Sequence, residues 1–340
     1  MNYTGLDCHN QYIHSQQMSA DGYLMKHDCI PTTDTALSIF LNSLDEPTHV
    51  TLEAGRNWWW ITQLLLDHPQ VSEVSVVDAR RSRRIAEELS VRSGYGRAKT
   101  DRIDAEMLAE QTRHHLAPAI YIPSLEQLQR RSIVRYRFNL VHQHTSLVSI
   151  LQSFFALQGL RLSIKRLIES WDSQLIYLEV LSEPFLFLVR QQIKQIEQLR
   201  GHIKECNDYI EQLIPDTEPR LKLLSTLPGI GPVLSRQIDT EIMTIDRFDS
   251  DRHLTSYSGL APIEQESAGR KGVIKLNAHC NYYLKNAFLM AAHCARHHPK
   301  YRVKYQRDLK RRGKKIAKIN LARKLVKSVY WMLTRQQPFK

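Results

Sequence analysis

The order of secondary-structure signals in the first 122 residues is the strongest constraint on how this chain folds. Short runs rich in β-branched and aromatic residues come first, and the tight-turn pair Asp21-Gly22 separates two of them. Apolar runs then alternate with segments whose apolar residues recur at helical spacing. The predicted strands are 3–8, 11–18, 23–29, 49–53 and 71–77, and the predicted helices are 33–44, 58–67, 79–89 and one from about residue 100. This order predicts an α/β domain with three antiparallel strands and further strands that alternate with helices, which is the order of a ribonuclease-H-like sheet.

The remaining two-thirds of the chain is predicted to be mostly helical. One series of apolar residues recurs at intervals of three and four, as in a coiled-coil seam with one slip. Its members are Leu186, Val189, Ile193, Ile196, Leu199, Ile203, Cys206, Ile210 and Leu213. An intramolecular helical hairpin and an intermolecular coiled coil both fit this spacing. We predict three domains: an α/β domain over 1–122, a helical coiled-coil region over 123–215 and a C-terminal domain over 216–340.

A short glycine-containing turn lies near the start of the predicted C-terminal domain. The sequence Pro228-Gly229-Ile230-Gly231 separates two helical patterns. Such a turn is typical of a helix-hairpin-helix, in which Gly229 and Gly231 let backbone N–H groups approach a DNA phosphate closely. A tight helix–helix connection without a ligand is the alternative.

Positive charge is concentrated near the end of the chain. The formal net charge is +12, and the stretch from Lys300 to Lys327 holds thirteen lysines and arginines against one acid, Asp308. The rest of the chain is therefore neutral, and a basic segment on a neutral body indicates nucleic-acid binding. Whether the phosphates belong to DNA or RNA stays open at this point. The candidate phosphate contacts are Lys310, Arg311, Arg312, Lys314 and Lys315.

Three features of the sequence bear on where the protein works. No stretch approaches the roughly 18 apolar residues that span a bilayer, so we expect no membrane partner. The first residues lack a basic start followed by an apolar run, and hence do not read as a signal peptide. The five cysteines are scattered without a CxxC pair, which argues against a disulfide framework and a zinc ribbon. We expect a cytoplasmic protein.

Four acidic residues stand where a metal site would need them. Asp7 ends the first predicted strand, Glu53 ends the strand over 49–53, and Asp101 and Asp104 lie three apart at the start of a predicted helix. Taken singly, each also suits a helix cap or a solvated strand end. Together, strand ends and a helix start can converge at one sheet edge. Their oxygen ligands suit Mg²⁺ or Mn²⁺, and two such ions stabilise both the attacking and the leaving oxygen in phosphoryl transfer.

Several short motifs at these positions resemble one family of mobile-element enzymes. They are Tyr3-Thr4-Gly5-Leu6-Asp7, Leu52-Glu53-Ala54, Lys99-Thr100-Asp101-Arg102-Ile103-Asp104-Ala105, Pro228-Gly229-Ile230-Gly231 and Tyr257-Ser258-Gly259-Leu260-Ala261-Pro262. This set resembles the DEDD-type insertion-sequence transposases of insertion-sequence family 110, over both predicted end domains. The resemblance implies a RuvC-like N-terminal domain, similar to Holliday-junction resolvases, whose four acids bind Mg²⁺.

The resemblance also implies a serine nucleophile that becomes linked to DNA. The matching residue is Ser267, and Arg270, Lys271 and Lys275 nearby are candidate phosphate contacts. Family members usually have glycine after this serine, whereas this chain has Ala268. Ser256 and Ser258 are rival candidates, but they lie in the Tyr257 to Pro262 stretch that we interpret as packing.

Partners follow from the same resemblance. Family members recombine double-stranded DNA under the guidance of a structured non-coding RNA that the element encodes. They act as homo-oligomers, a dimer or a tetramer, in which different subunits supply the two halves of an active site. Two other functions fit the residues: a metal-only nuclease or junction resolvase, in which Ser267 is incidental, and a non-catalytic nucleic-acid-binding protein.

Overall fold

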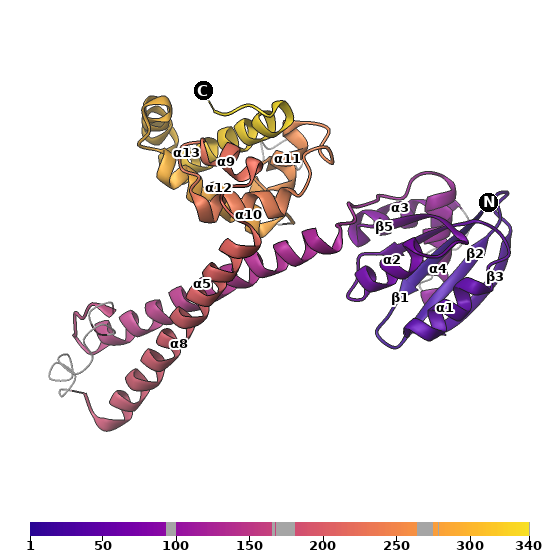
Figure 1. Cartoon of the computed structure of the whole chain (residues 1–340), viewed down its shortest axis with the longest axis horizontal. Helices are drawn as coiled ribbons and strands as arrows, with labels where there is room; N and C mark the ends of the chain where they lie inside the picture. Colours follow the sequence, from indigo (N-terminus) through magenta and orange to yellow (C-terminus); the bar gives the residue numbers. More distant parts are fainter. Residues whose placement is uncertain (93–99, 165–166, 168–180, 264–274, 278, 340) are drawn as a thin grey trace. The chain divides into compact units, whose positions relative to one another are not determined.

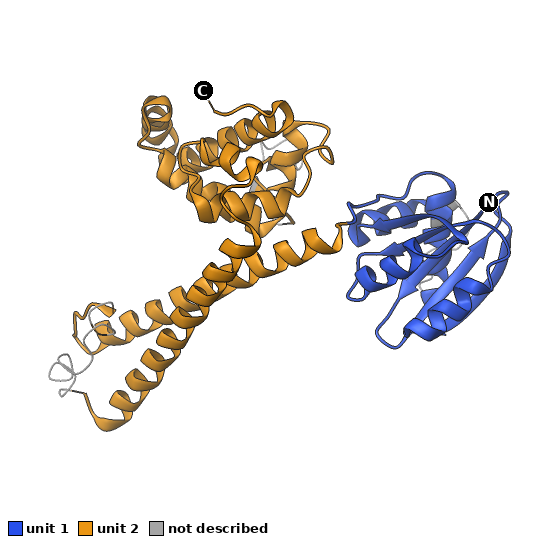
Figure 2. Cartoon of the chain, in the orientation of Figure 1, with its two compact units in different colours: residues 1–122 blue, residues 123–340 orange. Residues whose placement is uncertain are grey.

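The computed structural model describes residues 1–340 except 93–99, 165–166, 168–180, 264–274, 278 and 340. The chain forms two compact units, Met1–Ile122 (unit 1) and Pro123–Lys340 (unit 2), as Figure 2 shows. The division into three domains at residues 122 and 215 stays a prediction. None of the helices in the described ranges is long and apolar enough to cross a membrane.

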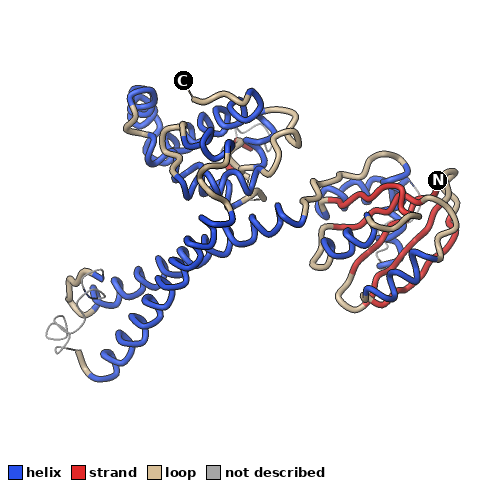
Figure 3. Tube along the Cα trace, in the orientation of Figure 1, coloured by secondary structure: helices blue, strands red, loops and turns tan. Residues whose placement is uncertain are grey.

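Unit 1 is built on a five-stranded mixed sheet (Figures 1 and 3). Strand β1 is antiparallel to β2 and parallel to β4, and the strand order is β3-β2-β1-β4-β5. This ribonuclease-H-like arrangement confirms the predicted α/β architecture. The strands are β1 (Asn2–Cys8), β2 (Tyr12–Met18), β3 (Leu24–Pro31), β4 (Thr48–Glu53) and β5 (Val71–Val77).

Helices of unit 1 begin where the sequence offers capping residues. The Thr33 hydroxyl accepts a hydrogen bond from the Ala36 N–H and caps the first helix. The Thr100 hydroxyl accepts one from the Ile103 N–H and caps the fourth helix. The four helices in the described part of unit 1 are α1 (Asp34–Asn42), α2 (Trp58–Leu66), α3 (Ala79–Arg92) and α4 (Asp101–Arg113). The cap at Thr100 places Asp101 and Asp104 in the first turn of α4.

The two faces of β1 contact different parts of unit 1, because alternate residues of a strand point to opposite sides of the sheet. Leu6 is fully buried in a core that includes Leu37 of α1 and Leu65 of α2. Gly5, on the opposite face, lies directly beneath α4. A Cβ atom on Gly5 would overlap the Ala105 carbonyl oxygen and lie 2.8 Å from the Ala109 backbone nitrogen. Glycine at this position therefore lets the backbone of α4 lie directly on β1.

The first part of unit 2 is a long helical hairpin made of α5 (Leu125–Leu157) and α8 (Glu183–Leu213). Near one end Arg137 Nε donates to Asn207 Oδ1 over 2.7 Å, and near the other the rings of Phe154 and Phe185 have centroids 5.4 Å apart. The two helices thus run antiparallel. The buried members of the apolar series on α8 are Val189, Ile193, Ile196, Cys206 and Ile210. The series packs against α5 of the same chain, as expected for an intramolecular helical hairpin.

The second part of unit 2 is a helical bundle around a single apolar core that extends from Leu224 to Leu333. The two-stranded ribbon β6–β7 is antiparallel. The elements are α9 (Pro219–Ser225), α10 (Pro232–Ile242), α11 (Asp251–Tyr257), β6 (Pro262–Ile263), β7 (Lys275–Leu276), α12 (Tyr282–Ala295) and α13 (Pro299–Arg335). The basic segment lies in α13, which is interrupted at Gly313, whose φ of +80° is not helical. Glycine adopts this conformation without the steric cost that a side chain would add.

Candidate active site

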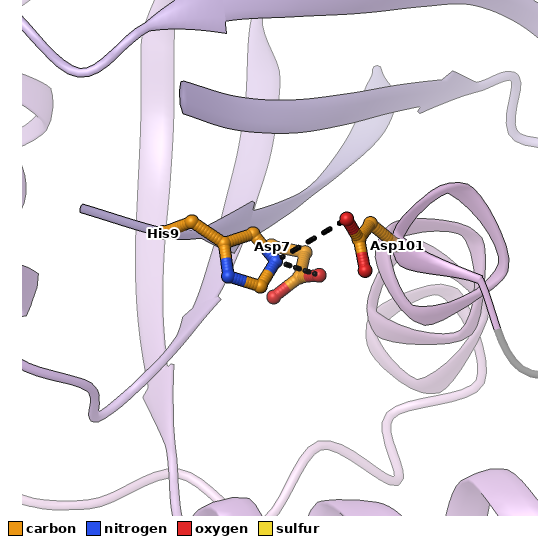
Figure 4. Close-up of side chains that lie close together, drawn as sticks. All are labelled: Asp7, His9 and Asp101. Carbon is orange, nitrogen blue, oxygen red and sulfur yellow. Dashed lines mark hydrogen bonds and ion pairs between the residues drawn. The ribbon is translucent and has the colours of Figure 1, made fainter. Parts of the chain in front are cut away.

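Three side chains of unit 1 converge where β1 ends and α4 begins (Figure 4). His9 Nε2 lies 3.1 Å from Asp7 Oδ2 and 3.6 Å from Asp101 Oδ2. Asp7 is on the same face of β1 as Gly5, because the two are separated by one residue. Asp101 is one helical turn before Ala105, which covers Gly5. The close packing of α4 on β1 therefore brings the two carboxylates together.

Glu53 and Asp104 belong to the same region of unit 1. Strands β1 and β4 are parallel, and Leu6 pairs with Leu52, so Asp7 and Glu53 follow this pair at the same edge of the sheet. The charges of Asp7 and Glu53 both help to raise the pKa of the Cys8 thiol, after burial, which is the larger cause. Asp104 adds to the negative field at Asp7. The structure thus gathers all four predicted acids around the end of β1.

The surroundings of Asp7 disfavour the negative charge of its carboxyl group. Burial raises the pKa of the Asp7 carboxyl, and His9 opposes the rise through its charge and its hydrogen bond, while Asp104 and Asp101 add to it. The Asp7 side chain is 17% exposed, against 43% for both His9 and Asp101, so one side of the cluster faces solvent. A cation at the centre would relieve the repulsion between carboxylates and would remain accessible to a substrate.

The donor atoms fit a divalent cation. Ligand atoms of Asp7, His9 and Asp101 all lie within 4.8 Å of one another. With metal–ligand bonds of about 2.1 Å, adjacent ligands of an octahedral ion lie roughly 3 Å apart. The 3.1 Å and 3.6 Å separations from His9 Nε2 are close to that spacing. Asp7, His9 and Asp101 are therefore positioned so that they could share one ion, with Glu53 and Asp104 in the same region.

Sequence reasoning did not identify the histidines of this site. Besides His9, His14 Nε2 lies 3.6 Å from Asp101 Oδ2, and His14 Nδ1 lies 3.2 Å from Nε2 of His27, whose ring stacks on it. Two signals were available. Asp7 and His9 are separated by one residue, and His14 pairs directly with Asp7 in the β1–β2 register. This pairing depends on the register of β1 against β2, which was not predicted.

The C-terminal site predictions divide into three groups. Ser267, Arg270 and Lys271 lie outside the described residues, and Lys275 is the first residue of β7. The five predicted cationic contacts of the basic segment are all exposed and flank Gly313. Of the rival serines, Ser256 is exposed, while Ser258 is buried and donates to the Thr255 carbonyl.

The glycine turn before α10 has a packing role as well as a predicted binding role. Gly229 has φ +93°, and a Cβ atom there would overlap the Ala291 carbonyl oxygen on α12. Gly231 is the N-cap of α10, and the space beside its Cα is open. Packing on α12 therefore explains the glycine at 229, while Gly231 lies on the open side of the turn.

Comparison with known proteins gives consistent matches over both units. A family model for DEDD transposases of the IS110 type matches residues 4–161, and one described as "Transposase IS116/IS110/IS902 family" matches 221–306. The chain is 22% identical over 251 residues to the transposase for insertion sequence element IS1111A of Coxiella burnetii. It is 30% identical over 147 residues to an uncharacterized 44.8 kDa protein of insertion element IS116 from Streptomyces clavuligerus.

These alignments cover 71% and 42% of this chain, and 68% and 36% of the two relatives' own lengths. The two family models match separate parts of the chain that together make up well over half of it. The match over 4–161 includes Asp7, Glu53, Asp101 and Asp104. The chain therefore belongs to the DEDD-type transposases of the IS110 family, and it is a DNA transposase.

Proposed function

We propose that this transposase cuts and rejoins DNA by phosphoryl transfer, with Asp7, Glu53, Asp101 and Asp104 as ligands of Mg²⁺ or Mn²⁺ and Ser267 as the nucleophile. The observation that carries the metal part is the convergence of these acids where α4 packs on β1. The family resemblance carries the serine part. Divalent ions bound there would act as Lewis acids on the phosphate oxygens.

The chain's own groups then have defined tasks. The Ser267 hydroxyl loses its proton and attacks the phosphorus, so that one P–O bond to the serine forms while one P–O bond to the DNA breaks. The proton leaves with the released DNA hydroxyl. His9 and Asp101 are each 43% exposed, so a DNA strand can reach the cluster from their side. Attack by that hydroxyl, or by another strand's, on the serine ester rejoins the DNA without further energy input.

His9 is an additional metal ligand in this proposal. Its Nε2 is on the edge of the same cluster, and imidazole nitrogen is a softer ligand than a carboxylate oxygen. An oxygen-and-nitrogen ligand set favours Mn²⁺ over Mg²⁺ more than oxygens alone do. We therefore expect Mn²⁺ to bind more tightly than Mg²⁺, and Mg²⁺ to support the reaction at higher concentration.

The partners in this proposal are double-stranded DNA and a structured non-coding guide RNA. The exposed cations on both sides of Gly313 support a nucleic-acid surface on α13, and the open side of the turn at Gly231 supports a second phosphate contact. The active form is proposed to be a homo-oligomer, a dimer or a tetramer, with a RuvC-like unit 1 from one copy and Ser267 from another. The place of action is proposed to be the cytoplasm.

A covalent protein–DNA adduct is the direct test of this mechanism. Purified protein, DNA with the element's own ends, Mg²⁺ and RNA from the element's flanking non-coding region are combined and resolved on a denaturing gel. We expect an adduct that requires the metal ion, disappears on addition of EDTA and is lost in Ser267→Ala. Ser256→Ala is the matched control, because Ser256 is an exposed serine in the same unit and should leave the adduct unchanged.

Free cleaved ends without any adduct, in wild type and Ser267→Ala alike, would instead establish a metal-only nuclease. The acid cluster in unit 1 favours this second function, because four carboxylates and a water molecule suffice for hydrolysis. Absence of cleavage in all proteins, with DNA binding retained, would contradict both catalytic functions.

A further inference from the structure

We infer that Arg131, Arg135 and Arg247 of unit 2 form a binding site for a backbone phosphate of DNA. The site lies near the residues that flank the segment containing Ser267. That the phosphate belongs to DNA rests on the proposed function, whereas the phosphate site itself rests on contacts within unit 2.

The centre of this cluster is an ion pair between α5 and α10. Arg135 Nε donates to Glu241 Oε1 over 2.6 Å, and Arg135 Nη2 donates to Oε2 over 2.7 Å. Asn281 Nδ2 also donates to Oε2, over 2.6 Å. Glu241 is only 1% exposed, so both of its oxygens are used inside the protein. The carboxylate has little capacity left for a further cation.

Arg131 is a further cation that this carboxylate does not satisfy. It lies one helical turn before Arg135 on the same face of α5. Burial is the main cause that lowers the pKa of the Arg131 guanidinium, and the charges of Arg135 and Arg247 lower it too, while Glu241 opposes them. Within the described part of the chain Arg131 has no hydrogen bond or ion pair. An anion bound beside such a half-buried guanidinium, close to two others, would be stabilised by charge-assisted hydrogen bonds.

Arg247 is the third cation, and aromatic rings hold it in place. Its guanidinium carbon lies 4.6 Å from the ring centroids of both Phe248 and Tyr257. Arg247 Nη2 also donates to the backbone carbonyl of Glu241 over 3.4 Å. Stacking of this kind fixes the plane of a guanidinium while its charge remains, which is a favourable arrangement for phosphate recognition.

The cluster adjoins both ends of the segment that holds the proposed nucleophile. Tyr257 ends α11, and Asn281 caps α12, so the chain between them contains β6, Ser267 and β7. The Asn281 backbone N–H donates to the Tyr257 carbonyl over 2.9 Å, and Asn281 Nδ2 lies 3.0 Å from the Tyr257 hydroxyl. Both ends of this segment therefore meet beside Glu241. A phosphate held by Arg131 would lie near the two ends of the segment that contains Ser267.

DNA binding by the full chain in EDTA tests this site without the metal chemistry. Fluorescence anisotropy of a labelled DNA duplex of random sequence is measured over a range of KCl concentrations. We expect Arg131→Gln to weaken binding about tenfold and to reduce the slope of log affinity against log salt by about one. Lys194→Gln is the control, because it removes the same charge from an exposed position on α8 and should change neither quantity.

Two further variants separate binding from folding. Arg131→Lys keeps the charge and should restore the salt slope, and its affinity for DNA should lie between those of the wild type and Arg131→Gln. Arg135→Gln leaves Glu241 buried beside a neutral side chain, so we expect it to lower the melting temperature, whereas Arg131→Gln should not. A lower melting temperature in Arg131→Gln would mean that the residue is structural, and an unchanged affinity and salt slope would overturn the site.

The same titration with an RNA duplex identifies the nucleic acid. An Arg131→Gln effect on DNA alone, or on DNA and RNA alike, supports a DNA phosphate site, and an effect on RNA alone overturns it. Because no metal ion is present, a failure of Ser267 to form an adduct leaves this result standing. Equally, an unchanged salt slope would leave the proposed metal and serine chemistry intact.

Discussion

We expect Asp7→Asn to lower the rate of Mg²⁺-dependent DNA cleavage by at least about a thousandfold. Asp7 is the least exposed of the three clustered side chains, and its Oδ2 lies 3.1 Å from the same His9 Nε2 that Asp101 Oδ2 approaches to 3.6 Å. An amide has the shape of the carboxylate but not its charge, so it binds a divalent cation poorly. Single-turnover cleavage of DNA with the element's ends measures the loss. Asp45→Asn, the same change at an exposed loop position, should react like the wild type.

The same variant has a second readout that does not depend on activity. Mn²⁺ should raise the melting temperature of the wild type by mass action, and it should not raise that of Asp7→Asn. In EDTA the variant should melt no earlier than the wild type, because the raised pKa of Asp7 means that burial of its charge opposes folding. Wild-type cleavage by Asp7→Asn would remove the acid cluster from the mechanism. A metal-induced shift that persists in the variant would place the ion elsewhere.

Gly5→Ala is expected to destabilise unit 1 by about 3 kcal/mol or more, the upper range for overpacking of a tight contact. The added methyl group would overlap the Ala105 carbonyl oxygen and approach Leu108 Cβ to 2.9 Å. These are backbone and near-backbone atoms of α4, so no side chain can rotate away. The helix must shift as a whole, and Asp101 at its start moves with it. Metal affinity and cleavage should therefore fall together with stability.

Hydrogen exchange measured by mass spectrometry resolves this effect within the chain. Amides of β1 and α4 should exchange faster in Gly5→Ala, while those of unit 2 stay unchanged. The control is Gly201→Ala in the middle of α8, where a Cβ atom would have open space around it. Alanine should stabilise that helix by roughly 0.5–1 kcal/mol. Unchanged exchange in β1 and α4 of Gly5→Ala would mean that α4 does not lie directly on β1.

Much of unit 1 could be predicted from sequence because its signals are local. The Asp21-Gly22 pair marks a turn in which Gly22 has φ +87°, and Thr33 and Thr100 mark helix starts through hydrogen bonds that reach three residues along the chain. Predicted element ends lie within three residues of the observed ones. The placement of acids at strand ends and at a helix start followed from these elements, and so did the expectation that they converge.

Contacts between distant parts of the chain could not be predicted in the same way. The ion pair between Arg135 and Glu241 is one example. The two residues are 106 positions apart, and nothing in the sequence around either one identifies its partner. His14 and His27 join the acid cluster only through strand register, and a shift of one residue would turn their side chains to the other face. The break at Gly313 could not be predicted either, because a single glycine is often tolerated within a helical pattern.

The sequence by itself therefore determined the α/β order of unit 1, the four acids at its element ends and the basic segment near the end of the chain. Each of these depends on residue type and short-range spacing, which the chain carries before it folds. Only the tertiary structure decided that His9 and His14 lie close to Asp101 and that the apolar series on α8 packs against α5. It also decided that Arg131 lies near Arg135 and Arg247 with no ion pair among the described residues. Periodicity identifies which face of an element is apolar or charged, but the group that covers this face is set by packing between residues far apart in sequence.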